Sequence, residues 1–85
     1  MSFATQVWSN AFCSAFDGFP ESLRNAIQNK VDAMGTRLAD FPHQRLKGCA
    51  QFRLRVGDYR VIYRFDLQRQ IIYLVEVGNR REVYR

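Results

Sequence analysis

The chain has 85 residues, of which 47% are hydrophobic and 14% aromatic, and its formal net charge is +5 at pH 7. This length fits one domain, residues 1–85, and the composition is typical of a folded protein rather than a disordered one. No apolar run approaches the roughly 18 residues of a membrane span, and no Lys or Arg precedes the first apolar stretch as in a secretory signal. We therefore expect a cytoplasmic protein without a membrane partner.

The N-terminal residues predict a strand and a short helix. Residues 3–8 alternate weakly between apolar and polar types, which favours a first strand. Ser9 stands at an N-cap position, and a helix over residues 10–17 would place Phe12 and Phe16 on one side before Gly18 ends it. Cys13 and Cys49 are too few and too far apart for a disulfide framework, so we expect buried free thiols.

A second, longer helix is predicted to begin at Pro20 and Glu21, because proline suits the first helical turn and the helix dipole favours an acidic side chain there. An apolar stripe at helical spacing follows, consisting of Leu23, Ile27, Val31, Met34 and Leu38. Gly35 should weaken the helix near its end. Pro42 is expected to stop it, because the residue before a proline is pushed toward extended geometry.

The only histidine, His43, lies in the loop after this helix. A single loop histidine is expected to be solvated. The sequence offers it no second histidine, no nucleophile at a plausible site and no acidic cluster, so a triad or a metal centre has no support. We expect no metal and no cofactor, and any chemistry must use arginine, lysine and tyrosine side chains.

Residues 51–66 predict a β-hairpin, because apolar residues alternate with charged ones on both sides of the turn signal at residues 56–58. The apolar side chains of each strand share one side. The other side gathers four arginines: Arg53, Arg55, Arg60 and Arg64. Like charges opposite each other destabilise a strand pair, so this grouping indicates a site that binds an anion.

A further strand is predicted over residues 70–77. It would place Ile71, Tyr73, Val75 and Val77 on one face and Ile72, Leu74 and Glu76 on the other. Because it is apolar on nearly both faces, it should lie inside the sheet. Residues 80–85 would close the chain as a short strand or an extended tail. The order of elements predicts an α+β fold, with two N-terminal helices packed on one face of a small, mainly antiparallel β-sheet and the opposite face open and basic.

The charge is divided unevenly along the chain. Residues 1–44 hold three cationic and four acidic side chains, a net charge of 3 − 4 = −1. Residues 45–85 hold ten cationic and four acidic side chains, a net charge of 10 − 4 = +6, and nine of the ten cations are arginines. Arginine's planar fork suits phosphate and carboxylate, so we expect a polyanionic partner, with nucleic acid first and an acidic protein second.

Three segments resemble the RelE/ParE toxin superfamily of bacterial toxin–antitoxin systems: residues 45–48, residues 52–63 across the hairpin, and residues 77–84. The strand ending at Ser9 and the two helices fit more loosely. The resemblance implies a RelE-like fold. The superfamily has two functional branches. RelE-like members are ribosome-dependent endoribonucleases that cut mRNA in the ribosomal A site, whereas ParE-like members inhibit DNA gyrase.

The resemblance favours the RelE-like branch, because Arg53, Arg60, Arg80 and Tyr84 match its catalytic positions. It implies a metal-independent mRNA interferase that inhibits translation. Arg60 and Arg80 would bind the scissile phosphate, and Arg53 would orient the ribose and phosphate or protonate the leaving group. Tyr84 would stack on a base or assist proton transfer, unless it only caps the core. Further RNA-binding residues would be Arg45, Lys47, Gln51, Arg55 and Arg81.

One departure leaves the general base unassigned. Well-studied RelE-like enzymes carry lysines on the first hairpin strand, where this chain has Gln51 and Arg53. Glutamine does not accept a proton at useful pH, and arginine is a poorer base than lysine. The site would rely on orientation and charge stabilisation, with the ribosome or Tyr84 supplying the rest. The alternatives are a ParE-like gyrase inhibitor and a catalytically weak toxin relic.

The resemblance also implies partners. RelE-like toxins are held inactive by a cognate antitoxin whose chain wraps over the basic site, and an acidic or amphipathic segment would suit the +6 half. The ribosome and mRNA are the expected targets. DNA binding normally belongs to the antitoxin, so we assign no direct DNA binding to this chain alone.

Overall fold

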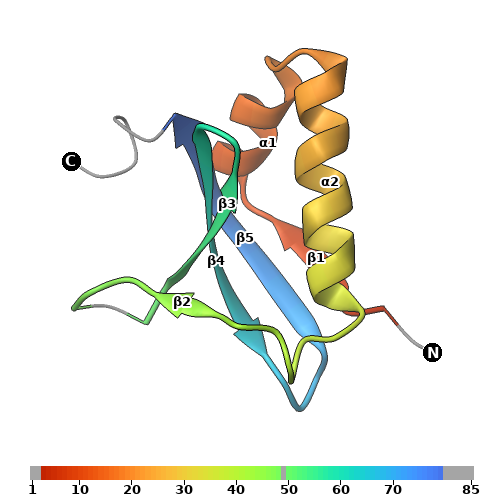
Figure 1. The fold of residues 1–85 in the computed structure, drawn as a ribbon, viewed down its shortest axis with the longest axis vertical. Helices are drawn as coiled ribbons and strands as arrows, with labels where there is room; N and C mark the ends of the chain where they lie inside the picture. Colours follow the sequence, from red (N-terminus) through yellow and green to blue (C-terminus); the bar gives the residue numbers. More distant parts are fainter. Residues whose placement is uncertain (1–2, 49, 80–85) are drawn as a thin grey trace.

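The computed structural model describes residues 3–48 and 50–79 (Figure 1). The elements are β1 (Thr5–Trp8), α1 (Asn10–Asp17), α2 (Glu21–Gly35), β2 (Gln44–Arg45), β3 (Phe52–Val56), β4 (Tyr59–Asp66) and β5 (Ile71–Asn79). They confirm the predicted α+β fold, since both helices lie on one face of a five-stranded sheet of order β1-β5-β4-β3-β2 (Figure 1). Only the β1–β5 pair is parallel among these strands.

The first helix begins where the sequence predicts, because Ser9 caps it. The Ser9 hydroxyl accepts the backbone N–H of Phe12 at 3.0 Å and donates to the carbonyl of Val75. The Ser9 backbone N–H also donates to the carbonyl of Leu74 at 3.0 Å. One residue thus satisfies the helix start and fixes it to β5. On this helix Cys13 is a free thiol, half-buried rather than buried as expected, and Cys49 lies outside the described residues.

A β-bulge in β5 changes which side chains face the helices. The pairing of β4 with β5 shifts between Ile62 and Tyr63, so Val75 is an extra residue on β5. Leu74 lies in the core before the bulge and Val77 lies in it afterwards. The prediction that Val77 shares a face with Val75 is therefore wrong, because the extra residue shifts the alternation. The predicted interior position of this strand is confirmed, since β5 lies between β1 and β4.

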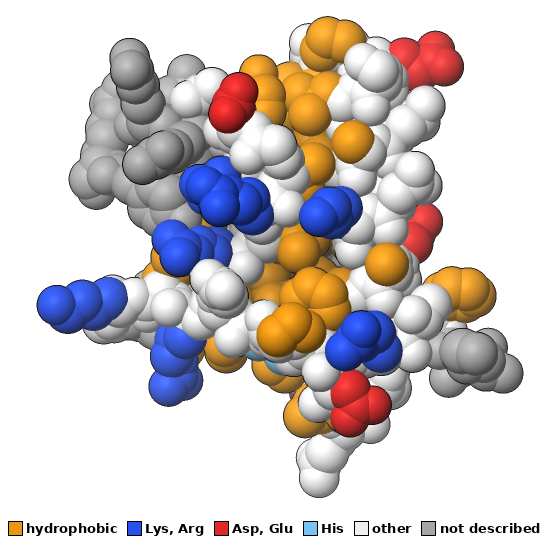
Figure 2. Space-filling model, viewed as in Figure 1, with side chains coloured by type: hydrophobic (Ala, Val, Ile, Leu, Met, Phe, Trp, Pro, Cys, Tyr) orange, Lys and Arg blue, Asp and Glu red, His pale blue; other side chains and the backbone are white. Residues whose placement is uncertain are grey.

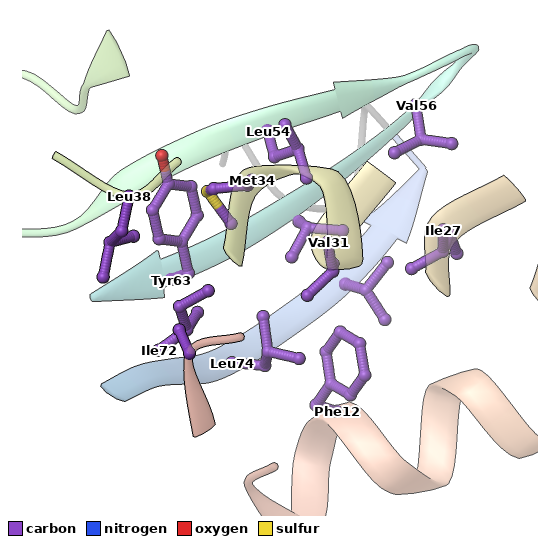
Figure 3. Packing of buried hydrophobic residues seen from close by; sticks show 13 residues of the cluster. Phe12, Ile27, Val31, Met34, Leu38, Leu54, Val56, Tyr63, Ile72 and Leu74 are labelled. Carbon is purple, nitrogen blue, oxygen red and sulfur yellow. The ribbon is translucent and has the colours of Figure 1, made fainter. Parts of the chain in front are cut away.

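The apolar stripe of α2 forms the centre of the core. Ile27, Val31, Met34 and Leu38 are buried, and Leu23 packs at the edge of the same cluster. Figure 3 shows the four buried side chains meeting Phe12 of α1 and apolar side chains from β3, β4 and β5. The predicted stripe is confirmed from Leu23 to Met34, whereas Leu38 is buried from the turn after the helix. Neither described helix is long and apolar enough to cross a membrane.

The second helix ends earlier than predicted. It stops at Gly35, and the chain then turns through Thr36–Asp40 instead of continuing to Pro42. The Gly35 carbonyl accepts the backbone N–H of Ala4 at 3.2 Å. A Cβ at Gly35 would lie 3.6 Å from atoms of Ala4, so the end of the helix packs closely against the chain entering β1. This contact fixes the point from which the following loop crosses to the sheet.

His43 is not solvated as predicted but anchors that loop to the sheet. Its Nε2 lies 2.7 Å from the Leu38 carbonyl, which can only accept, so Nε2 carries the proton. In the neutral ring Nδ1 then accepts from the Tyr63 hydroxyl at 2.6 Å. The ring stacks on Phe65 with centroids 4.1 Å apart. Burial raises the pKa of the Tyr63 phenol, so the hydroxyl stays protonated and available as a donor.

Candidate functional site

A groove with a volume of about 630 Å³ opens along the outer edge of β3. Arg53, Leu54 and Arg55 of β3 line this groove, and β2 pairs with β3 only at Phe52 and Arg53 among the described residues. The lining comes from α2, from the loop after it, from β2 and from both hairpin strands. It includes four cationic side chains and no carboxylate from the described residues: Lys30, Arg53, Arg55 and Arg60. Figure 2 shows Lys and Arg side chains on both sides of a band of hydrophobic side chains.

The hairpin positions three of these cations. Arg53 and Arg55 alternate with buried Leu54 and Val56 along β3, so their side chains turn away from the core. Arg55 lies directly opposite Arg60 in the strand register. Gly57 makes the tight connection possible, because its φ of +60° is a conformation that side chains rarely adopt. The turn therefore brings two guanidinium groups to neighbouring positions.

Arg53 and Arg60 are held in different ways. The exposed Arg53 donates from Nε and Nη2 to Oε1 of Gln44, at 3.3 and 3.1 Å. Arg60 is only 5% exposed and donates to the carbonyls of Tyr59 at 3.1 Å and Gly57 at 3.5 Å. These hydrogen bonds restrict both guanidinium groups, which reduces the entropy lost on binding an anion. Only a small part of Arg60 reaches the groove.

The face of the sheet opposite the helices is not uniformly open. Ile62 and Arg60 belong to this face by their register, yet they are only 3% and 5% exposed. The expectation of an open, basic face is therefore wrong at these two positions. The exposed basic surface lies instead toward the edge of the sheet, at β3.

Arg64 does not join the other arginines. Its guanidinium lies over the ring of Tyr73, 5.2 Å from the centroid, and both side chains line a separate hollow at the end of β4. Four residues of strand separate Arg64 from Arg60, which corresponds to about 13 Å. The predicted cluster of four arginines is therefore wrong for Arg64, and Lys30 supplies the fourth cation of the groove.

The other predicted RNA-binding residues lie outside the groove. Arg45 is exposed and lies over the ring of Phe52, at 5.8 Å from the centroid. Lys47 is exposed in the following turn. Gln51 is half-buried, and its carbonyl accepts the backbone N–H of Leu46 at 2.8 Å. The remaining predicted site residues, Arg80, Arg81 and Tyr84, lie outside the described residues.

Sequence reasoning missed the helix side of the groove. Lys30 precedes the buried Val31 on α2, and Phe41 follows the turn after the helix. The helical periodicity indicates only that Lys30 faces outward. The packing of α2 beside β3 brings Lys30 close to the arginines, and no pattern in the sequence predicts that packing.

The site has the chemistry of an anion-binding surface. Fixed cations and a rigid hairpin can bind phosphate groups and stabilise negative charge that develops on them. Within residues 3–48 and 50–79, no three His, Cys, Asp or Glu side chains lie together as metal ligands would.

The comparisons with known proteins place the chain in a family. Residues 7–84 match the family model of the ParE toxin of the type II toxin–antitoxin system parDE. The fold and this match define a toxin of a type II toxin–antitoxin system. The chain belongs to the ParE toxin family, within the RelE/ParE superfamily that its sequence resembles. No curated protein matches the sequence significantly.

Solved structures share the fold. The toxin–antitoxin complex RelBE2 from Mycobacterium tuberculosis contains a chain with 18% identity and a TM-score of 0.76, with 94% of each chain covered. The isolated RelE toxin of E. coli has 15% identity and a TM-score of 0.76, covering 95% of this chain and 90% of that one. A chain of the archaeal RelE–RelB complex from Pyrococcus horikoshii has 20% identity and a TM-score of 0.75, covering 93% and 97%.

Proposed function

We propose that the protein is a ribosome-dependent mRNA endonuclease that inhibits translation in the cytoplasm. The observation that supports this most directly is the groove, where four cations and no described carboxylate line a space at the edge of β3. A single RNA strand carries one negative charge per nucleotide and needs such a surface. The RelE-like fold of the chain is compatible with the same activity.

The proposed reaction is attack of an RNA 2′-hydroxyl on the neighbouring phosphorus, with departure of the 5′-oxygen. Arg60, held by two turn carbonyls, presents positive charge to the scissile phosphate. Arg53 is oriented by Gln44 and contacts the ribose or phosphate. Arg80 and Tyr84 are proposed to complete the site. The arginines stabilise the negative charge that grows on the phosphorane, and the general base stays unassigned among them.

Inhibition of DNA gyrase is the second candidate, and a specific observation favours it. The family model that matches residues 7–84 describes ParE toxins, and the described groove holds cations without an evident general base. A toxin that only binds its target needs no proton transfer. A catalytically weak relic is the third possibility that the experiment below separates.

The proposed partners follow from the charge of the groove. A cognate antitoxin with an acidic or amphipathic segment would neutralise it, and several related structures are complexes of RelE with RelB. The ribosome and mRNA are the proposed targets of the free toxin. We assign it no membrane or DNA partner of its own.

Induction of the toxin in a bacterial host, followed by mapping of transcript ends, tests the proposal. Codon-phased cuts in mRNA support the endonuclease, whereas intact mRNA with DNA damage and altered supercoiling supports the gyrase inhibitor. Absence of both effects leaves the relic.

Arg53→Ala, Arg60→Ala and Arg80→Ala should each abolish growth arrest while binding to the antitoxin persists. Arg69→Ala is the control, because Arg69 is exposed beside Asp66, outside the groove. Undiminished arrest in the three variants would contradict the site.

A further inference from the structure

We infer that the helix side of the groove is a second RNA subsite, in which Lys30 binds a backbone phosphate and Phe41 stacks on a base. The RNA strand would then lie between α2 and β3 and contact both walls. This inference rests on the proposed RNA target and adds residues that neither the family resemblance nor the sequence pattern indicates.

Lys30 is presented to the groove by a rigid helix. The neighbouring Val31 is only 1% exposed and Ile27 is fully buried, so α2 is fixed to the sheet. Lys30 itself is exposed and lines the groove. The ion pair resolved among the described residues joins Arg69 to Asp66, so no described carboxylate neutralises Lys30. Its ammonium group is therefore available to a phosphate.

The nearest acidic residue along α2 is committed elsewhere. Asp32 Oδ1 accepts from Nε2 of Gln6 and from Nε2 of Gln28, each at 2.8 Å. The bond from Gln6 joins the helix to β1, at the far edge of the sheet from β3, and the bond from Gln28 lies within the helix. The charge of Asp32 is thus directed away from the groove, and Lys30 keeps its positive potential there.

Phe41 supplies an aromatic surface in the same groove. Its backbone N–H donates to the Arg37 carbonyl at 2.9 Å, and its carbonyl accepts from the N–H of His43 at 2.8 Å. Its ring also packs against His43, with centroids 5.2 Å apart, and His43 is bonded to the sheet. The ring is therefore held in place before a ligand binds, and it stays half-buried rather than enclosed.

The combination of groups favours RNA over an acidic peptide. Cations on two walls attract either polyanion, but an aromatic ring beside them matches the alternation of phosphate and base in a single strand. Gln44, whose Oε1 orients Arg53, adds an amide that can contact a base edge or a 2′-hydroxyl. An acidic peptide would use the cations and gain little from the ring.

Binding of a fluorescent 2′-O-methyl RNA oligonucleotide to the purified toxin tests the inference, because this RNA lacks the attacking hydroxyl. The dissociation constant is measured at several salt concentrations. Lys30→Ala should weaken binding several-fold and reduce the slope of log K against log salt by about 0.7. Phe41→Leu should weaken binding on the order of tenfold with an unchanged slope, whereas Phe41→Tyr should bind like the parent protein.

The matched control is Arg24→Ala, which removes a cation from the same helix outside the groove. Equal effects of Arg24→Ala and Lys30→Ala, full affinity in Phe41→Leu, or a parent protein that binds an acidic peptide but no oligonucleotide would each overturn the inference. Circular dichroism confirms folding of every variant.

A toxin that binds RNA through Lys30 and Phe41 yet cuts no mRNA would reject the proposed endonuclease and keep the subsite. Full mRNA cutting with unchanged RNA affinity in the variants would reject the subsite alone.

Discussion

Alternate residues of β3 serve two regions of very different character. Leu54 and Val56 belong to the helix-facing core, although Leu54 also touches the groove at the sheet edge, whereas the exposed Arg53 and Arg55 supply the charge of that groove. In the core, no buried side-chain nitrogen or oxygen of the described residues lacks a hydrogen-bond partner. In the groove, Arg55 and Arg60 are opposite each other in the strand register, with no described carboxylate among the lining residues. The first arrangement stabilises the fold. The second reduces stability through repulsion between like charges and leaves a surface suited to binding an anion.

The comparison teaches that stability and function are separable in this small domain, although they share strands. Truncation in the core should reduce the free energy of unfolding and affect function only through folding. Truncation of an exposed groove side chain should reduce anion binding and leave folding nearly unchanged. Four substitutions test this separation, from the largest expected effect on stability to the smallest.

Ile27→Ala should have the largest effect. Ile27 is fully buried in the core, and shortening such a side chain costs about 2–5 kcal/mol through lost burial and the cavity left behind. Urea unfolding followed by circular dichroism measures this loss. Val7→Ala on β1 is the control, because Val7 is 44% exposed and its truncation should change stability by less than about 0.5 kcal/mol. Equal losses in the two variants would remove the distinction between core and surface.

Ser9→Ala should come next. The substitution removes the cap of α1, which costs about 0.5–2 kcal/mol, and also leaves the Val75 carbonyl at the bulge without its hydroxyl donor. Ser14→Ala on the exposed side of the same helix serves as the control. The midpoint of thermal unfolding should fall for Ser9→Ala and stay the same or rise for Ser14→Ala. A midpoint for Ser9→Ala equal to that of Ser14→Ala would mean that the cap does not fix the helix to β5.

Tyr63→Phe should have an intermediate effect that depends on pH. Loss of the hydroxyl that donates to His43 should cost about 1 kcal/mol near neutral pH. Burial raises the pKa of the Tyr63 phenol in the folded state, so its contribution is complete below the unfolded pKa of about 10 and is lost as pH rises above that value. Denaturant titrations from pH 8 to pH 11 should show a steeper loss in the parent protein than in Tyr63→Phe. Parallel pH profiles would contradict a buried phenol.

Arg55→Ala should change stability least. Arg55 is exposed and faces Arg60, so its removal should alter the free energy of unfolding by a few tenths of a kcal/mol, in the stabilising direction. The affinity of the Arg55→Ala variant for RNA should nevertheless fall several-fold, because the groove loses a cation. Urea unfolding and oligonucleotide binding measured on one preparation check both values. A large loss of stability would show that the groove contributes to the fold.

Most of the fold was predictable from local patterns. The stripe from Leu23 to Leu38 predicted α2 and its buried face, the cap at Ser9 predicted the start of α1, and the alternation across residues 51–66 predicted the hairpin. These features depend on neighbouring residues, whose spacing alone determines which side they share. The arginines of β3 and Arg60 could be placed together for the same reason.

Contacts between distant segments were not predictable in this way. The extra residue Val75 shifts the face of Val77, and Ser9, far away in the sequence, donates a hydrogen bond to the Val75 carbonyl. His43 is held by Leu38 and Tyr63 rather than by water. Lys30 reaches the groove only because α2 packs beside β3.

The sequence by itself determined the α+β class, the superfamily resemblance and the concentration of arginine in the C-terminal half, because composition and short-range periodicity carry that information. The tertiary structure alone decided which cations share a groove and which residues face it from the helix. Both features depend on strand register and helix packing. The free energy of such long-range contacts depends on several distant segments at once, so no single segment of the chain predicts it.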